Sequence, residues 1–331
     1  MTINDFRTTP LPDNIVNALI EATQAYAYMD VLVNEYSTSK SALFDILLSL
    51  DVYYGYYDTN PDICLICHSL YIPEQPNNVS KNVYTINACR EYAQNNVRVR
   101  DVLTALDLIK IDKSIKTANK ELLTDTKYSN NSDRQIEIVW GILHDLYGPK
   151  HQYPLLLESA IACYRLLTVS NVYSLNLQTI AILLSTLYQN NLAFHGLYRQ
   201  WTVSTPPQLN IVSLDVGDAL IHILNIFQQM WIYTTKLIRE LNSTKEKLLR
   251  SNQVSERFCR ILTENFCIRN QDVSEKLLIS PKTTIKHLKK FEQEKVIYSR
   301  KSGREIFYFN NILLDLLKQI TEVSNNGSEK S

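Results

Sequence analysis

The chain has 331 residues, 45% of them hydrophobic, which is enough for roughly two or three domains with sizeable cores. Its 34 basic and 34 acidic side chains balance, so net charge alone points to no class of partner. No apolar run approaches the ~18 residues of a membrane span, and the N-terminus lacks the pattern of a signal peptide. We therefore expect a cytoplasmic protein with no membrane partner, whose six cysteines stay reduced.

Glycine is scarce, with seven residues where average usage would give ~23, and apolar residues recur at helical spacing. We predict a mainly α protein. A long helix from 213 to about 252 has a polar second half, suited to bridging two domains. Helices are also expected over residues 13–33, 39–57, 83–95, 99–111, 113–124 and 136–146, and on both sides of the segment 169–179.

Two segments are expected to lack regular structure. Residues 60–78, NPDICLICHSLYIPEQPNN, contain three prolines and are predicted to form a loop-rich break. The polar tail, residues 323–331, is predicted to be disordered.

The first of these segments contains Cys64, Cys67 and His68, which match the C-x-x-C-H pattern of c-type haem attachment. That chemistry needs a secreted compartment. A zinc site needs about four ligands, and the sequence offers no second close Cys/His pair. We interpret the pattern as chance and core packing, and expect neither a metal nor another cofactor.

Residues 251–322 carry the strongest structural pattern. An amphipathic helix from Ser255 is followed by a short helix over 271–279 and a third helix from Pro281, with Ser280 as its N-cap. Alternating apolar and polar residues around a turn at Gly303 then predict a β-hairpin, and a last helix follows. Helix, helix-turn-helix and hairpin in this order predict a winged helix domain.

The third helix is expected to turn Ile285, Leu288 and Phe291 towards the core of this domain. Lys295 stands where the turn after such a helix often uses a left-handed glycine. Either the lysine adopts that conformation at a cost of ~1 kcal/mol, or the turn differs.

Basic residues are enriched in this region, because residues 251–320 hold 13 Lys and Arg against 8 Asp and Glu. A winged helix usually inserts its third helix into the major groove of DNA and sets its hairpin against the backbone. The expected DNA contacts are Lys282, Thr283, Lys286, His287, Lys289, Lys290, Arg300, Lys301 and Arg304. The first four of these residues are placed to reach base edges, and the other five are placed to contact phosphates. Many such domains bind proteins instead, and exposed lysines are often merely solvated.

The order of helical region, long helix and winged helix resembles the multidomain Fic family of nucleotidyl transferases. Residues 170–178, SNVYSLNLQ, occupy the position of that family's H-P-F-x-D/E-G-N-G-R motif, between AIACYRLLTV and TIAILLSTL. The resemblance implies an N-terminal helical region over 1–95 and a Fic-like helical core over 96–250. The alternative is that the middle region is an unrelated helical bundle.

The resemblance also implies that the catalytic groups are lost. The family's general base falls at Ser170, its Mg²⁺-binding acid at Ser174 and its phosphate-binding Arg at Gln178. Both phosphate-cradling glycines are leucines here, so Asn176 is the one match and a weak candidate for nucleotide contact. The family's inhibitory Glu is also missing, since no Glu occurs over 38–71.

We therefore predict a catalytically inactive Fic-like protein that regulates transcription by binding DNA through its winged helix. The helical body would serve dimerisation, ligand sensing or partner binding. Lys286→Ala plus Lys290→Ala should weaken a strongly salt-dependent DNA affinity. Two alternatives stay open: a protein adenylyltransferase that moves AMP from ATP to a target hydroxyl, and a protein-interaction module. ATP and Mg²⁺ would bind only if the pocket is retained.

Overall fold

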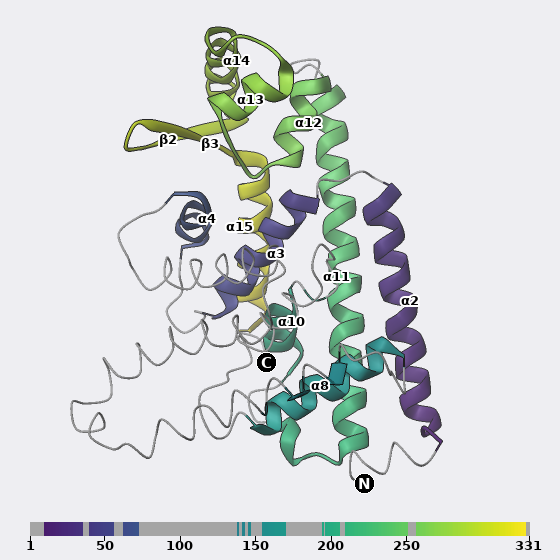
Figure 1. Ribbon diagram of the computed structural model, residues 1–331. Helices are drawn as coiled ribbons and strands as arrows, with labels where there is room; N and C mark the ends of the chain where they lie inside the picture. Colours follow the sequence, from purple (N-terminus) through teal and green to yellow (C-terminus); the bar gives the residue numbers. More distant parts are fainter. Residues whose placement is uncertain are drawn as a thin grey trace, which may run out of the picture. The chain divides into compact units, whose positions relative to one another are not determined.

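The computed structural model describes residues 10–35, 40–55, 62–72, 154–169, 196–205, 209–250 and 256–328, with positions 138, 141–142, 145–146 and 194. These residues are mainly helical and include one small sheet, which confirms the predicted mainly α class (Figure 1). The predicted helices over 83–124 and the motif segment 170–178 lie outside the described residues.

The chain forms two compact units. Unit 1 comprises Met1–Tyr26 and Lys81–Trp231, and unit 2 comprises Ala27–Ser80 and Ile232–Ser331. The domain boundaries expected near residues 95 and 250 remain predictions. Helices near the N-terminus group with the C-terminal elements through packing, which a linear reading of composition does not detect.

The long predicted helix is present as α11, Val216–Arg250, and it contains the boundary between the units. It is preceded by a 3₁₀ turn at Ile211–Ser213, where the Asn210 side chain accepts a hydrogen bond from the Val212 amide at 3.2 Å. Helix α2, Asp13–Glu35, also spans the boundary.

Unit 1 further contains helices α8, Leu155–Val169, and α10, Leu197–Ser204. Its core includes the aromatic rings of Phe194, Phe227 and Trp231, whose centroids lie 5.0 to 6.1 Å apart. Tight contact among large buried rings stabilises this helical packing.

Unit 2 contains α3, Lys40–Gly55, and α4, Ile63–Tyr71. The loop expected over 60–78 is therefore wrong for Ile63–Tyr71. Asp62 caps α4 by accepting a hydrogen bond from the Cys64 amide at 2.8 Å, and Ile66 and Cys67 are fully buried. The prolines that favoured a loop stand at positions 61, 73 and 76, outside the helix.

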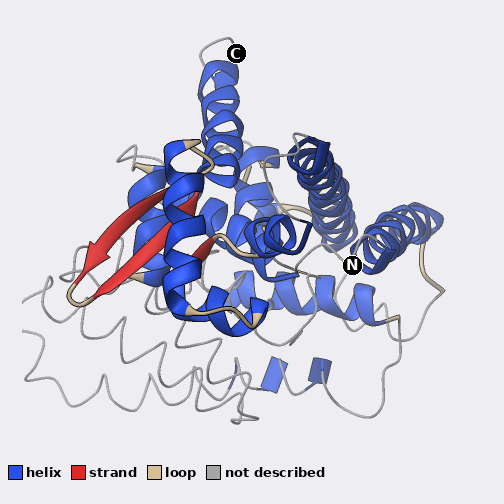
Figure 2. Cartoon of the chain, turned by 90° about the horizontal axis from the view of Figure 1, so that it is seen from above, coloured by secondary structure: helices blue, strands red, loops and turns tan. Residues whose placement is uncertain are grey.

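The C-terminal module, residues 256–310, follows the predicted order of helices and hairpin, and its strands are the red arrows of Figure 2. Its elements are α12, Glu256–Glu264; β1, Cys267–Arg269; α13, Asn270–Leu277; α14, Pro281–Gln293; β2, Ile297–Ser302; and β3, Glu305–Asn310. The strands form an antiparallel sheet in the order β1-β3-β2. Strand β1 was not predicted, because three residues are too few to show an alternating pattern.

The module has its own core. Phe258 packs on Phe291 with centroids 4.5 Å apart, and Leu288 is fully buried. Our placement of Ile285 in this core is wrong, since its side chain is 39% exposed while Thr284 is fully buried. The Thr284 hydroxyl donates to the Ser280 carbonyl at 3.2 Å, so its burial leaves no unpaired polar group.

Two helix ends of the module use left-handed residues other than glycine. Leu278 has φ 55° after α13 and Lys295 has φ 58° after α14, which confirms the left-handed turn expected at Lys295. In both turns the next amide bonds a carbonyl five residues back, from Ile279 to Ser274 and from Val296 to Phe291. These are Schellman-type caps, where glycine is the usual residue. Gly303 in the hairpin turn also has a positive φ, of 59°.

Helix α15, Asn311–Ser328, follows β3 directly, and the side chain of the buried Asn310 accepts a hydrogen bond from the Ile312 amide at 3.0 Å. The helix continues through residues 323–328, which we expected to be disordered. Buried Leu313, Leu314 and Leu317 fix its first turns, and extending an existing helix avoids the cost of a new nucleus. In the described part of the chain no helix is long and apolar enough to cross a membrane.

Candidate nucleic-acid interface

Helix α14 is held firmly at its start. Ser280 is the N-cap, and its hydroxyl accepts a hydrogen bond from the Thr283 amide at 3.1 Å. Pro281 occupies the first turn, where no amide hydrogen is needed. The buried face, Thr284, Leu288 and Phe291, fixes which residues face solvent.

The solvent face of α14 carries cations without internal partners. Lys282, Lys286 and Lys289 are exposed, and among the described residues none of them has an ion-pair partner. Lys290 differs, because its Nζ lies 3.7 Å from Glu294 Oε1. Exposed ion pairs of this kind contribute less than about 1 kcal/mol to stability. Lys290 is therefore partly neutralised by Glu294, but it can still leave this pair to contact another group.

The two other residues predicted on α14 are exposed but already in contact with the module. The Thr283 hydroxyl lies 2.8 Å from the Ser280 hydroxyl, within the cap. The His287 ring lies 6.1 Å from the Phe258 ring, centroid to centroid. Both side chains keep an exposed edge beside the lysines.

The three cations predicted on the hairpin differ in their exposure to solvent. Lys301 and Arg304 are exposed and flank the turn at Gly303. Arg300 is half-buried, and its guanidinium donates a hydrogen bond to Nδ1 of His68 on α4. Residues 300 and 301 point to opposite faces of β2 because side chains alternate along a strand. Lys301 and Arg304 are therefore exposed to solvent, whereas Arg300 contacts α4.

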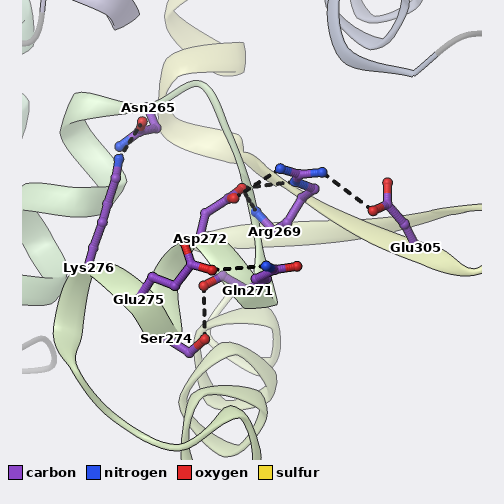
Figure 3. Close-up of polar contacts among 8 residues, drawn as sticks. All are labelled: Asn265, Arg269, Gln271, Asp272, Ser274, Glu275, Lys276 and Glu305. Atoms are coloured by element: carbon purple, nitrogen blue, oxygen red, sulfur yellow. Dashed lines mark hydrogen bonds and ion pairs between the residues drawn. The ribbon is translucent and has the colours of Figure 1, made fainter.

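Helix α13 is polar too, yet its charges are paired within the module (Figure 3). Arg269 Nε lies 3.0 Å from Asp272 Oδ2, and Arg269 Nη1 lies 3.4 Å from Glu305 Oε1. The hydrogen bond with Asp272 raises the pKa of Arg269. Asp272 also accepts from the Arg269 amide at 3.1 Å, which caps α13.

The remaining polar side chains of α13 are similarly engaged (Figure 3). Lys276 donates to Asn265 Oδ1 at 3.2 Å, and Gln271 donates to Glu275 Oε1 at 2.9 Å. The Ser274 hydroxyl donates to the Gln271 carbonyl at 2.8 Å. Figure 3 shows two of these contacts within α13 and the third between Lys276 and Asn265, which follows α12. Helix α13 therefore offers less free charge than its composition suggests.

Sequence reasoning missed one group of residues, the side chains between α4 and the sheet. His68 lies against Phe309 with ring centroids 4.8 Å apart, and its Nε2 bonds the Tyr298 hydroxyl. Tyr71 stacks on Phe266 at 6.4 Å and donates to Asp45 of α3. The C-x-x-C-H pattern marked His68, but only the fold shows what the side chain contacts.

The cysteines of this region show no sign of a reactive or metal-binding role. Burial raises the pKa of Cys64, and raises those of Cys67 and Cys267 further. Such thiols stay protonated at neutral pH. In the portion of the chain that is described, no three His, Cys, Asp or Glu side chains are grouped so as to hold a metal ion.

The positions that the resemblance assigns to the family's motif, Ser170, Ser174, Asn176 and Gln178, lie outside the described residues. Nearby in the sequence, the Asp145 carboxylate forms an ion pair with Arg165 of α8 at 3.0 Å.

Comparison with known proteins gives structural likenesses and no match in sequence. No family model and no curated protein matches the sequence. Over 91% of the chain, the fold is similar to 97% of a Fic family protein from Desulfovibrio desulfuricans G20, with a TM-score of 0.47 and 13% identity. This is the family that the order of the parts resembles in the sequence. At this identity the likeness concerns the fold, so activity and partner depend on the chain's own residues.

Proposed function

We propose that the C-terminal module is a winged helix domain and that the protein is a DNA-binding regulator. The carrying observation is the solvent face of α14, where Lys282, Lys286 and Lys289 are exposed without ion-pair partners among the described residues. A capped helix with one buried face, which presents unpaired cations on its solvent face, suits insertion into the major groove.

The hairpin adds Lys301 and Arg304, two exposed cations at its turn, in position for the DNA backbone. Contacts of this kind give affinity and salt dependence, with little sequence information. Base selection would fall to the first turns of α14, where Lys282, Thr283, Lys286 and His287 lie. A protein-interaction module would bind with much weaker salt dependence, which separates the two functions.

The test compares two double variants with equal loss of charge. Lys286→Gln with Lys289→Gln removes two unpaired cations of α14. Lys276→Gln with Lys318→Gln removes two that are engaged elsewhere in unit 2, by Asn265 and by Asp315. Both proteins are titrated by fluorescence anisotropy against a labelled duplex of mixed sequence.

We expect the α14 variant to lower the slope of log K against log salt by about 0.9, since each phosphate contact contributes about 0.9 and Lys289 is the one of the two that is assigned to a phosphate. The control variant should change the slope little. Equal losses in the two variants would show that general charge, and not the face of α14, drives binding.

We further propose that segment 170–178 performs no transfer of AMP. Its sequence holds no His, Asp, Glu, Arg or Gly, so a base, a metal ligand, a phosphate-pairing cation and an anion-binding loop are all missing. Millimolar ATP with Mg²⁺ should therefore leave the melting temperature of the full chain unchanged. A ligand at ~100 times its Kd would add ~2.7 kcal/mol, which shifts the midpoint by several degrees. Such a shift would contradict this part of the proposal.

A further inference from the structure

Ile285 is an apolar side chain on the exposed surface of α14. The buried side of this helix is formed by Thr284, Leu288 and Phe291, whereas the Ile285 side chain is exposed. Isoleucine is also a poorer helix former than lysine, so helix propensity gives no reason for it at an exposed position. Neither the core of the module nor the stability of the helix explains this residue, and its side chain is accessible to a partner of α14.

The neighbours of Ile285 on the helix surface are two of the lysines proposed to reach base edges. Lys282 precedes it by three residues and Lys286 follows it by one, and both are exposed. Residues three apart in an α-helix lie side by side on its surface. Ile285 and Lys282 therefore present an apolar group next to a cation on the part of α14 that is proposed to enter the major groove.

This position distinguishes Ile285 from the other exposed apolar side chains of the module. Among the described residues these are Leu278, in the turn after α13, and Ile306, on strand β3 of the hairpin. Neither belongs to α14. Ile285 is thus the described large apolar side chain that is exposed on the proposed recognition helix.

The base that matches this pair of groups is thymine. A lysine ammonium offers three donors and no acceptor. In the major groove, thymine presents the O4 acceptor together with its 5-methyl group, whereas guanine presents two acceptors and no methyl group, and cytosine presents a donor. An apolar side chain beside a donor is therefore complementary to the edge of thymine.

We propose that Ile285 is a specificity-determining residue that contacts the 5-methyl group of one thymine in the target duplex. Lys282 or Lys286 donates to an acceptor at the same or the next base pair. The inference rests on the proposed DNA-binding function and adds to it a preference for T·A at one position. Because the contact is apolar, it adds sequence preference without adding to the salt slope.

The test removes the methyl group and nothing else from the DNA. A preferred duplex is first selected from a random library with the full chain. Each thymidine is then replaced in turn by deoxyuridine, which keeps the O4 acceptor and the pairing with adenine but lacks the methyl group. The duplexes are titrated by fluorescence anisotropy with the parent, with Ile285→Ala and with Ile306→Ala. The last variant is the matched control, because Ile306 is 44% exposed and Ile285 is 39% exposed.

We expect one thymidine at which the replacement weakens binding by the parent about threefold to fivefold, since burying one methyl-sized group changes affinity by a factor of about four. The same replacement should leave the affinity of Ile285→Ala unchanged, and Ile306→Ala should respond as the parent does. The salt slopes of the three proteins should agree.

An affinity of the parent that is unchanged by every replacement overturns the inference. A sensitivity that persists in Ile285→Ala overturns it as well, and so does salt-dependent binding that selects no sequence from the library. In each of these cases the proposed function stands. The replacements tested on the parent need no variant, so the outcome does not depend on the folding of Ile285→Ala. If no duplex is bound at low salt, the proposed function fails and the inference fails with it.

Discussion

Helices α13 and α14 are consecutive in the chain, and both are polar, but their charges are arranged differently. Around α13, Arg269 is paired with Asp272 and Glu305, and Lys276 with Asn265. On α14, Lys286 and Lys289 have no such partners within the described part of the chain. The count of basic residues in a region therefore says less about its partner than the pairing of each residue does.

The largest expected effect concerns the core that orients α14. Phe291→Ala should destabilise unit 2 by about 3–5 kcal/mol, because a fully buried ring leaves a cavity against Phe258. Urea denaturation followed by circular dichroism measures the loss. Ile285→Ala on the same helix is the control and should cost less than about 1 kcal/mol, as its side chain is 39% exposed. Similar losses in the two variants would mean that the buried face of α14 is wrongly assigned.

A smaller effect is expected at the two left-handed helix ends. Lys295→Gly after α14 and Leu278→Gly after α13 should each raise the free energy of unfolding by about 0.5–1 kcal/mol, because glycine has no Cβ to strain at positive φ. Leu278 is 88% exposed, so little packing is lost with its side chain. Thermal melts of the single variants check this, and a lower midpoint in both would contradict the left-handed caps.

The smallest effect separates neighbouring lysines on α14. Lys289→Gln should weaken DNA binding about threefold to fivefold and lower the salt slope by about 0.9. Lys290→Gln should weaken it less, because Lys290 must leave Glu294, 3.7 Å away, to contact a phosphate. When both chains carry Glu294→Gln, the loss caused by Lys290→Gln should become as large as the loss caused by Lys289→Gln. A larger loss at Lys290 than at Lys289 would reverse the ranking that ion pairing predicts.

The sequence predicts the module well where local chemistry determines structure. Ser280 and Pro281 mark the start of α14, and Gly303 with its alternating flanks marks the hairpin. The prolines on both sides of α4 predict a loop, so the sequence does not predict this helix, although Asp62 is a good N-cap. Which of Thr284 and Ile285 is buried depends on the rotation of α14 against its neighbours, which periodicity does not fix.

The candidate site follows the same pattern. The exposed lysines of α14 could be predicted because a helix with a defined buried face has a defined solvent face. The withdrawal of Arg300 towards His68 could not, because it depends on a contact across more than two hundred residues of sequence. Neither could the neutralisation of Arg269, which involves Glu305 on a strand that follows much later.

The most direct test of the central claim is the salt dependence of duplex DNA binding by the unmodified full chain at pH 8. Three exposed cations are assigned to phosphates, Lys289, Lys301 and Arg304. They predict a plot of log K against log salt with a slope of about −2.7 or steeper. A slope near zero, or no binding at low salt, would contradict the account and assign the basic face of α14 to solvent or to a protein partner.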